Sequence, residues 1–199
     1  MKVAGSPLVP LLRSRVQAEA LVVVLANPDR EWSLSELARR VGASVATVQR
    51  EIARAEEAGV VRTRKVGNTR LVRADEHGTL TQPLTDLLER ALGPKQLLGD
   101  ALSAVPGVEA AFLFGSWAAR YSGDRGPAPN DIDVLVIGEP DRGALDDAIA
   151  PVELRLAHPD QVTVRRRQWW ESGSDSFRRE IAQRPIVELI GLPDGKPPA

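Results

Sequence analysis

Cysteine is absent from this 199-residue chain, and histidine occurs only twice, as His77 and His158. The lack of cysteine excludes disulfide bonds, thiol catalysis and cysteine-bound zinc. The two histidines lie far apart beside expected loops, so we expect both on the surface and no histidine-rich metal site.

Long apolar runs are also missing. The longest covers residues 20–26, whereas a helix that crosses a bilayer needs roughly 20 apolar residues. Prolines and arginines interrupt the first 15 residues, so no secretory signal is expected and the cytoplasm is the expected location. We therefore expect no membrane partner.

The residues that are present give a globular composition with an uneven charge. Hydrophobic residues make up 43% and charged residues 27% of the chain, and the net charge is −1. Residues 1–78 hold 13 basic and 9 acidic residues, a net charge of +4, so the remaining residues carry −5. A basic first part and an acidic second part predict two modules with different partners.

Three helices are predicted in the first module. Apolar residues at helical spacing indicate a helix over residues 12–26. Ser33 and Glu36 match a capping box at the start of a short second helix. Ser44 can cap a third helix over residues 45–58. Val45 and the apolar residues that follow it at helical spacing are expected to face inward.

A hairpin follows these helices. Two β-branched, basic runs over residues 60–66 and 69–73 are joined by Gly67-Asn68, a pair typical of two-residue hairpin turns. The order of helix, capped helix, turn, helix and hairpin is that of a winged helix-turn-helix, expected over residues 1–78.

The third helix and the hairpin carry side chains suited to DNA, because Thr, Gln and Arg can hydrogen-bond base edges and phosphates. Residues 44–52, SVATVQREI, resemble the recognition helix of winged-helix transcription regulators of the ArsR type. We expect double-stranded DNA as partner and a two-fold homodimer. The expected DNA-binding residues are Ser44, Thr47, Gln49, Arg50, Arg54, Arg64, Lys65 and Arg70. The alternative is a winged helix that binds protein and has a solvated basic face.

A helical linker is expected over residues 79–104, a second domain over 105–192 and a disordered tail over 193–199. In the second domain a buried strand ends at Phe114 and is followed by Gly115-Ser116. Gly115 lets the backbone approach a phosphate closely, and Ser116 with the first helical amides can hold its oxygens.

Asp131 and Asp133 are two residues apart on another expected strand, so both carboxylates leave the same face. Paired hard oxygen ligands suit Mg²⁺, which would bridge them to a nucleoside triphosphate. Residues 115–138, GSWAARYSGDRGPAPNDIDVLVIG, resemble the minimal nucleotidyltransferase fold of the polymerase-beta superfamily. The resemblance implies that Gly115 and Ser116 bind the triphosphate and that Asp131 and Asp133 are catalytic metal ligands.

One departure from that superfamily concerns catalysis. Active members usually place a third acid on the next strand, where it helps deprotonate the acceptor hydroxyl. Here that strand reads QVTV, and Thr163 stands at the expected position. A nucleotide-binding domain without transfer activity and an active nucleotidyltransferase therefore both remain open.

The expected fold class is α/β of the α+β kind, a winged helix followed by a small mixed-sheet nucleotidyltransferase-like domain. The favoured function is a DNA-binding transcription regulator whose second domain binds a nucleoside triphosphate with Mg²⁺. The first alternative is an enzyme that transfers a nucleotide to a protein, RNA or small-molecule hydroxyl. A second is a scaffold or antitoxin-like protein with a polypeptide partner.

Overall fold

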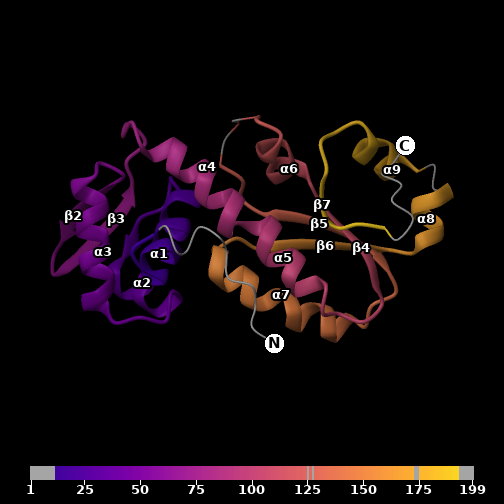
Figure 1. The fold of residues 1–199 in the computed structure, drawn as a ribbon, viewed down its shortest axis with the longest axis horizontal. Coiled ribbons are helices and arrows are strands. Elements are labelled where there is room, and N and C mark those ends of the chain that lie inside the picture. The colour runs from indigo at the N-terminus through magenta and orange to yellow at the C-terminus, as the bar shows by residue number, and fades with distance from the viewer. Residues whose placement is uncertain (1–11, 125, 127, 173–174, 193–199) are drawn as a thin grey trace. The chain divides into compact units, whose positions relative to one another are not determined.

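The computed structural model describes residues 12–124, 126, 128–172 and 175–192. The chain divides into two compact units. Unit 1 contains the described residues up to Gly93 together with Arg155–Ala157, and unit 2 contains Pro94–Leu154 and the described residues from His158 onward. Both units mix helices with strands (Figure 1), which confirms the predicted fold class. The expected disordered tail lies outside the described residues.

Unit 1 has the element order and sheet of a winged helix. Its three strands pair antiparallel in the order β1-β3-β2, and β2 and β3 form the hairpin. Helix α4 packs against α1. The elements are α1 (Arg15–Ala26), β1 (Trp32–Ser33), α2 (Leu34–Arg40), α3 (Val45–Glu57), β2 (Val61–Val66), β3 (Thr69–Ala74) and α4 (Thr81–Leu92).

Serine caps fix where the first three helices begin. The Ser33 hydroxyl accepts a hydrogen bond from the Glu36 amide, and the Ser44 hydroxyl accepts one from the Thr47 amide, so both predicted caps are confirmed. Ser14 caps α1 in the same way. The inward placement of Val45 is wrong: its exposed fraction is 43%, because this first residue of α3 lies at the margin of the stripe that buries Val48.

Unit 2 is a four-stranded mixed sheet with helices on its faces. The strand order is β6-β5-β4-β7; β5 and β6 are parallel, and β4 pairs antiparallel with β5 and β7. The elements are α5 (Pro94–Leu102), β4 (Val108–Phe114), α6 (Gly115–Tyr121), β5 (Ile132–Gly138), α7 (Arg142–Leu156), β6 (Asp160–Arg165), α8 (Arg167–Ser172), α9 (Ser176–Ala182) and β7 (Val187–Ile190). The last two residues of α7, Arg155 and Leu156, are counted with unit 1.

The strand register places side chains in rows across one face of this sheet. Gln161, Asp133 and Phe114 form the first row, on β6, β5 and β4. The next row contains Leu135 and Phe112, which belong to a hydrophobic core with Trp170 of α8 and Ile181 of α9. Helices α8 and α9 therefore cover this face beyond the first row, and α7 runs along the opposite face (Figure 1).

Three features differ from the sequence-based expectations. His158 is buried, with an exposed fraction of 4%, although a surface position was expected; its ring packs edge-on against Trp117. The sequence predicts a helix over about residues 142–157 whose second half begins at Pro151, whereas α7 runs unbroken through that proline. Strand β1 was not predicted, because two residues become a strand only through pairing with β3. In the part of the chain that the structure describes, every helix is too short or too polar to cross a membrane.

Candidate nucleic-acid interface and acidic pair

The outer face of α3 presents the polar side chains expected to contact DNA. Ser44, Gln49 and Arg50 are exposed, and Thr47 is partly exposed. The opposite face of the helix is held in the core by Val48 and Ile52. Because the helix is anchored on one side only, its polar side is available to another molecule.

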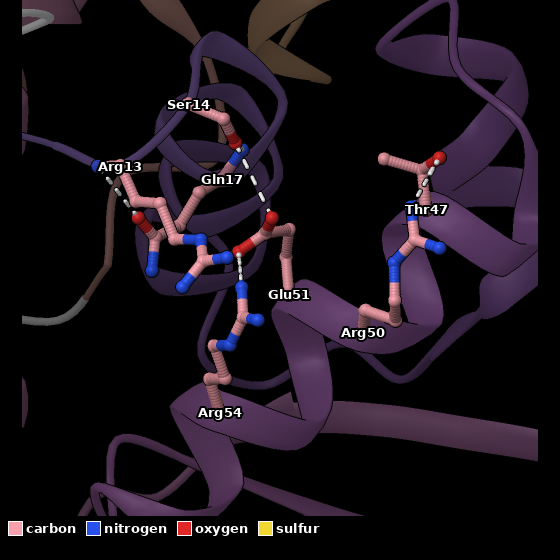
Figure 2. Close-up of polar contacts among 7 residues, drawn as sticks. All are labelled: Arg13, Ser14, Gln17, Thr47, Arg50, Glu51 and Arg54. Carbon is pink, nitrogen blue, oxygen red and sulfur yellow. Dashed lines mark hydrogen bonds and ion pairs between the residues drawn. The ribbon is translucent and has the colours of Figure 1, made fainter.

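Arg50 is positioned by two hydroxyl groups at the start of α3, and Figure 2 shows its contact with the second of them, that of Thr47. The hydroxyls of Ser44 and Thr47 are 2.9 Å apart, and the Arg50 guanidinium donates to Thr47 Oγ1 over 3.4 Å. Among the described residues no carboxylate pairs with Arg50. Its guanidinium therefore keeps most of its donors for an external acceptor.

Arg54 is held differently, by an acid within unit 1. Its guanidinium lies 3.3 Å from Glu51 Oε2, while Glu51 Oε1 accepts from the hydroxyl of Ser14, the cap of α1 (Figure 2). The exposed fraction of Glu51 is 8%. This carboxylate ties the start of α1 to the middle of α3 and partly neutralises Arg54.

The hairpin arginines are also paired with acids of unit 1. Arg64 makes a two-bond contact with Glu31, whose pKa is lowered by that hydrogen-bonded guanidinium. Arg70 donates to Glu56 over 2.8 Å. Beyond these two candidates, Arg62 pairs with Asp75 and Arg73 with Glu76. The basic appearance of the hairpin in the sequence therefore overstates its free positive charge.

Lys65 differs from the hairpin arginines, which are paired with acids. It is exposed, and within the described residues no acid pairs with it. It also lines a hollow of about 370 Å³ whose other walls are the polar and basic residues of the hairpin, Thr63, Arg64, Asn68 and Arg70. A hollow lined by three cationic side chains suits an anionic group such as a phosphate.

Gly67 sets the shape of the hairpin tip. Its φ of 56° lies in the left-handed region, whereas Asn68 has a negative φ. A positive φ at the first central residue is the requirement of a type II′ turn, which glycine meets without strain. The predicted hairpin is thus confirmed, and Lys65 lies close to its tip.

In unit 2 the strand register brings Asp133 against Gly115. Asp133 pairs with Phe114, the residue before Gly115. Gly115 has a φ of 67°, and a β-carbon there would overlap Oδ2 of Asp133 and lie 3.1 Å from its Cγ. Only glycine allows this close approach of carboxylate and backbone.

The two aspartates of this region are electrostatically coupled. Partial burial raises the pKa of Asp133, and the neighbouring Asp131 carboxylate raises it further. Within the described residues no group donates a hydrogen bond to either carboxylate. Two like charges without donors favour an external cation at this edge of the sheet. Ser116, in the first turn of α6, is exposed.

The side chain beside Asp133 on the neighbouring strand is neutral. The register pairs Asp133 with Gln161, and Thr163 pairs with Leu135, one row deeper in the core. The residue at the level of Asp133 is thus Gln161 rather than the expected Thr163, and neither can act as a base at neutral pH. Among the described residues, no cluster of three or more acidic or histidine side chains could hold a metal ion.

Comparison with known proteins adds little to this description. No protein-family model and no curated protein sequence matches the chain. Reduced HlyU from Vibrio cholerae is similar, with 24% identity, 44% of this chain and 86% of that chain covered, and a TM-score of 0.35. AF1382 from Archaeoglobus fulgidus is 19% identical over 43% of this chain and 98% of its own, with a TM-score of 0.36. A mutant of Lactococcus lactis ZitR has 18% identity, covers 45% and 62%, and gives 0.32. These scores are low, so the helix order and strand order of unit 1 alone define the winged helix.

Proposed function

We propose that unit 1 binds double-stranded DNA and that the protein is a transcription regulator. The observation that carries the proposal is the exposed polar face of α3, with Arg50 oriented by Thr47, next to a hairpin that carries Lys65. In this arrangement α3 lies in the major groove and the hairpin contacts the adjacent backbone. Because half-sites for such domains are commonly related by two-fold symmetry, we propose a homodimer on DNA.

Each exposed residue has a distinct part in this binding. Arg50 can donate two hydrogen bonds to a guanine, and Gln49 can make a paired contact with an adenine. Lys65 and the hollow beside it receive phosphate, which gives affinity without sequence preference. Arg64 and Arg70 can contribute only by leaving Glu31 and Glu56 for phosphate oxygens.

The test is a binding titration on DNA selected from random sequence, with random DNA in parallel. R50A is expected to bind selected DNA about tenfold or more weakly and random DNA almost as tightly as the wild-type protein does, since a paired guanine contact contributes roughly 1–3 kcal/mol. K65A is expected to weaken binding to both DNAs and to reduce the salt dependence by about one ion. R142A, an exposed arginine of unit 2 paired with Asp146, is the matched control.

An absence of binding to either DNA at low salt would overturn this proposal and favour a protein partner. The homodimer is tested by light scattering of the eluting protein with and without selected DNA. A monomer that binds one half-site with full affinity would contradict it.

For unit 2 we propose a site for a Mg²⁺-bound nucleoside triphosphate at the edge formed by Gly115, Ser116, Asp131 and Asp133. The close approach of the Asp133 carboxylate to Gly115 supports it. The ion would neutralise the two carboxylates and bridge them to phosphate oxygens. Asp131 and Asp133 would bind the ion, and Ser116 would donate to a phosphate oxygen.

The neutral Gln161 beside Asp133 favours binding without transfer. Calorimetry with the four common nucleoside triphosphates and Mg²⁺ tests the site, and D133N is expected to abolish the heat of binding. The second candidate, transfer of a nucleotide to a hydroxyl, is favoured by the Asp131–Asp133 pair itself. It predicts labelling of an acceptor by radioactive triphosphate that disappears in D133A, and no labelling by the wild-type protein would exclude it.

A further inference from the structure

A group of aromatic side chains lies on the same sheet face as the acidic pair. Phe114 is the direct neighbour of Asp133 on β4. The ring of Phe177 from α9 meets Phe114 edge-on, with 5.6 Å between centroids, and Trp169 from α8 lies 5.8 Å from Phe177. We call Phe114, Phe177 and Trp169 the aromatic shelf.

The aromatic shelf differs from the core beneath it in exposure. Its three members are only partly buried against that core. Trp170, the neighbour of Trp169, is 5% exposed and stacks on Phe112 with 4.7 Å between centroids. Trp170 therefore supplies the core packing, and the Trp169 ring is left at the surface, where it can meet another planar group.

A cation flanks the aromatic shelf. The Arg165 guanidinium carbon lies 5.5 Å from the ring centroids of both Trp169 and Phe177. Among the described residues no carboxylate forms an ion pair with Arg165. The Trp169 indole N–H is already used, because it donates to Asp175 over 2.5 Å; that bond occupies the edge of the ring and fixes its orientation.

We infer that the aromatic shelf binds the base of the nucleotide whose phosphates are held at Asp131 and Asp133; this inference rests on the nucleotide site proposed for unit 2. The shelf begins beside Asp133 and extends away from it toward Arg165. A nucleoside triphosphate has the same order, with charged phosphates at one end and a planar base at the other. Stacking on an aromatic ring does not depend on which base is present. The Arg165 N–H groups can donate hydrogen bonds to acceptors on the edge of the base.

The test uses the full chain and compares two Mg²⁺-bound probes, a nucleoside triphosphate and inorganic tripolyphosphate, which has no base. Calorimetry measures affinity, and tryptophan fluorescence reports on stacking, because Trp32, Trp117 and Trp170 are buried. The nucleotide is expected to bind about tenfold more tightly than tripolyphosphate and to change the fluorescence, since stacking on an aromatic ring is worth roughly that factor or more per base. Tripolyphosphate is expected to leave the fluorescence unchanged.

Three variants and one control separate the contribution of the base from that of the phosphates. W169A is expected to bind the nucleotide about tenfold more weakly than the wild-type protein and to bind tripolyphosphate with unchanged affinity. W169F, which keeps a ring and the packing, should lose the fluorescence change but retain most of the affinity. R165A is expected to weaken only the nucleotide, whereas R166A, whose arginine pairs with Glu139, should bind both probes as the wild-type protein does.

Equal affinity of the wild-type protein for the two probes, or undiminished nucleotide binding by W169A, would overturn the inference and leave the aromatic shelf as an anchor for α8 and α9. In that case the phosphate site stands, because tripolyphosphate still binds and D133N still abolishes its binding. If the wild-type protein binds neither probe, the proposed nucleotide site itself is wrong, and the inference fails with it.

Discussion

At the scale of single residues, two hairpin arginines of unit 1, Arg64 and Arg70, are held by acids that lie far from them in the sequence, so no local pattern indicates these pairings. Glu31 and Arg64 are 33 residues apart, and Glu56 and Arg70 are 14 apart. Glu56 also accepts hydrogen bonds from the Thr63 amide and hydroxyl, so it attaches the hairpin to α3. Exposed ion pairs of this kind add little stability, and their larger effect is on the charge offered to DNA.

Replacing Glu31 with glutamine is expected to strengthen DNA binding several-fold at low salt. The substitution removes one negative charge near the expected phosphates and releases Arg64 from a two-bond contact. Titrations of E31Q and the wild-type protein over a range of salt measure the effect, which should shrink as salt screens the charges. Unchanged affinity in E31Q would show that Arg64 lies away from the DNA.

Asp160 is an acid that the chain buries without a partner. Both carboxylate oxygens are inaccessible, and within the described residues no hydrogen-bond donor reaches them. Burial and, to a smaller extent, the nearby Glu153 carboxylate together raise the pKa of Asp160 from its ordinary 3.8 to about 7. The folded protein therefore binds a proton that the unfolded chain releases above about pH 4, so this residue costs stability as the pH rises from 4 to 7.

D160N is expected to be more stable than the wild-type protein at pH 8, by up to about 4 kcal/mol, and to gain much less at pH 4. The asparagine carries no charge in either state, so the cost of burying a carboxylate disappears. Denaturant unfolding at both pH values measures the difference, and D124N, at an exposed aspartate of the same unit, is the control. A gain that does not depend on pH would contradict this account.

At the scale of elements, serine caps set where α2 and α3 begin. Ser33 and Ser44 have the same role at α2 and α3, each accepting from the amide three residues later over 3.2 Å. Only Ser44 also contacts the hydroxyl of Thr47, which in turn positions Arg50. One cap is therefore purely structural, and the other also orders the expected DNA-reading face.

S33A and S44A are each expected to lose about 1 kcal/mol of stability. DNA recognition should separate them, because only S44A removes a group that orders Thr47 and Arg50. Thermal unfolding measures the first effect, and relative affinity for selected and random DNA measures the second. Equal loss of discrimination in both variants would mean that Ser44 acts only through helix stability.

The junction of β4 and α6 depends on glycine in two ways. Gly115 has a left-handed φ and also makes room for the Asp133 carboxylate, whereas Gly123 has a φ of 99° and open space, with no atom within 4 Å of the point that a β-carbon would occupy. Both glycines incur backbone strain when replaced by alanine, and only Gly115 would also force the carboxylate to move.

G115A is therefore expected to lose binding of Mg²⁺-nucleotide, while G123A should bind as the wild-type protein does. Each variant should also unfold at a lower temperature, because a left-handed alanine costs about 1 kcal/mol. Calorimetric titration and thermal unfolding of the two variants make the comparison. Full nucleotide binding by G115A would show that the position of Asp133 does not matter.

Most helices and strands could be predicted from patterns among neighbouring residues. The features that were missed depend on pairing between segments that are distant in the sequence. The caps at Ser33 and Ser44 and the turn at Gly67 depend on neighbouring residues, so the sequence was sufficient for them. Strand β1 exists only because Trp32 pairs with Val72. The register that puts Gln161 beside Asp133 is a pairing between β5 and β6, two strands that α7 separates in the sequence, so neighbouring residues do not indicate it.

At the scale of the whole molecule, the uneven charge coincides with the division into two units. The basic residues are concentrated in the first 78 residues, with a net charge of +4, and the rest of the chain carries −5. We therefore expect unit 1 to attract DNA and the acidic residues that follow to repel it. Each unit has its own sheet and its own core, which is the usual condition for separate unfolding.

Calorimetric unfolding is expected to show two transitions that respond to different ligands. DNA should raise the transition of unit 1, and Mg²⁺-nucleotide should raise that of unit 2, because each ligand stabilises the part that binds it. The D160N substitution identifies the transition of unit 2. A single transition that both ligands shift together would show that the units unfold as one.

If unit 1 binds DNA as proposed, its paired arginines have a kinetic consequence for the search along a genome. To contact random DNA, each of these arginines must leave its carboxylate for a phosphate. Such a contact adds little binding free energy, so the complex dissociates quickly. On a matching sequence Arg50 and Gln49 add contacts that need no such exchange, and the dwell time lengthens. Internal carboxylates would thus shorten the time spent on unproductive sites, so the number of free cations tunes how fast the target is found.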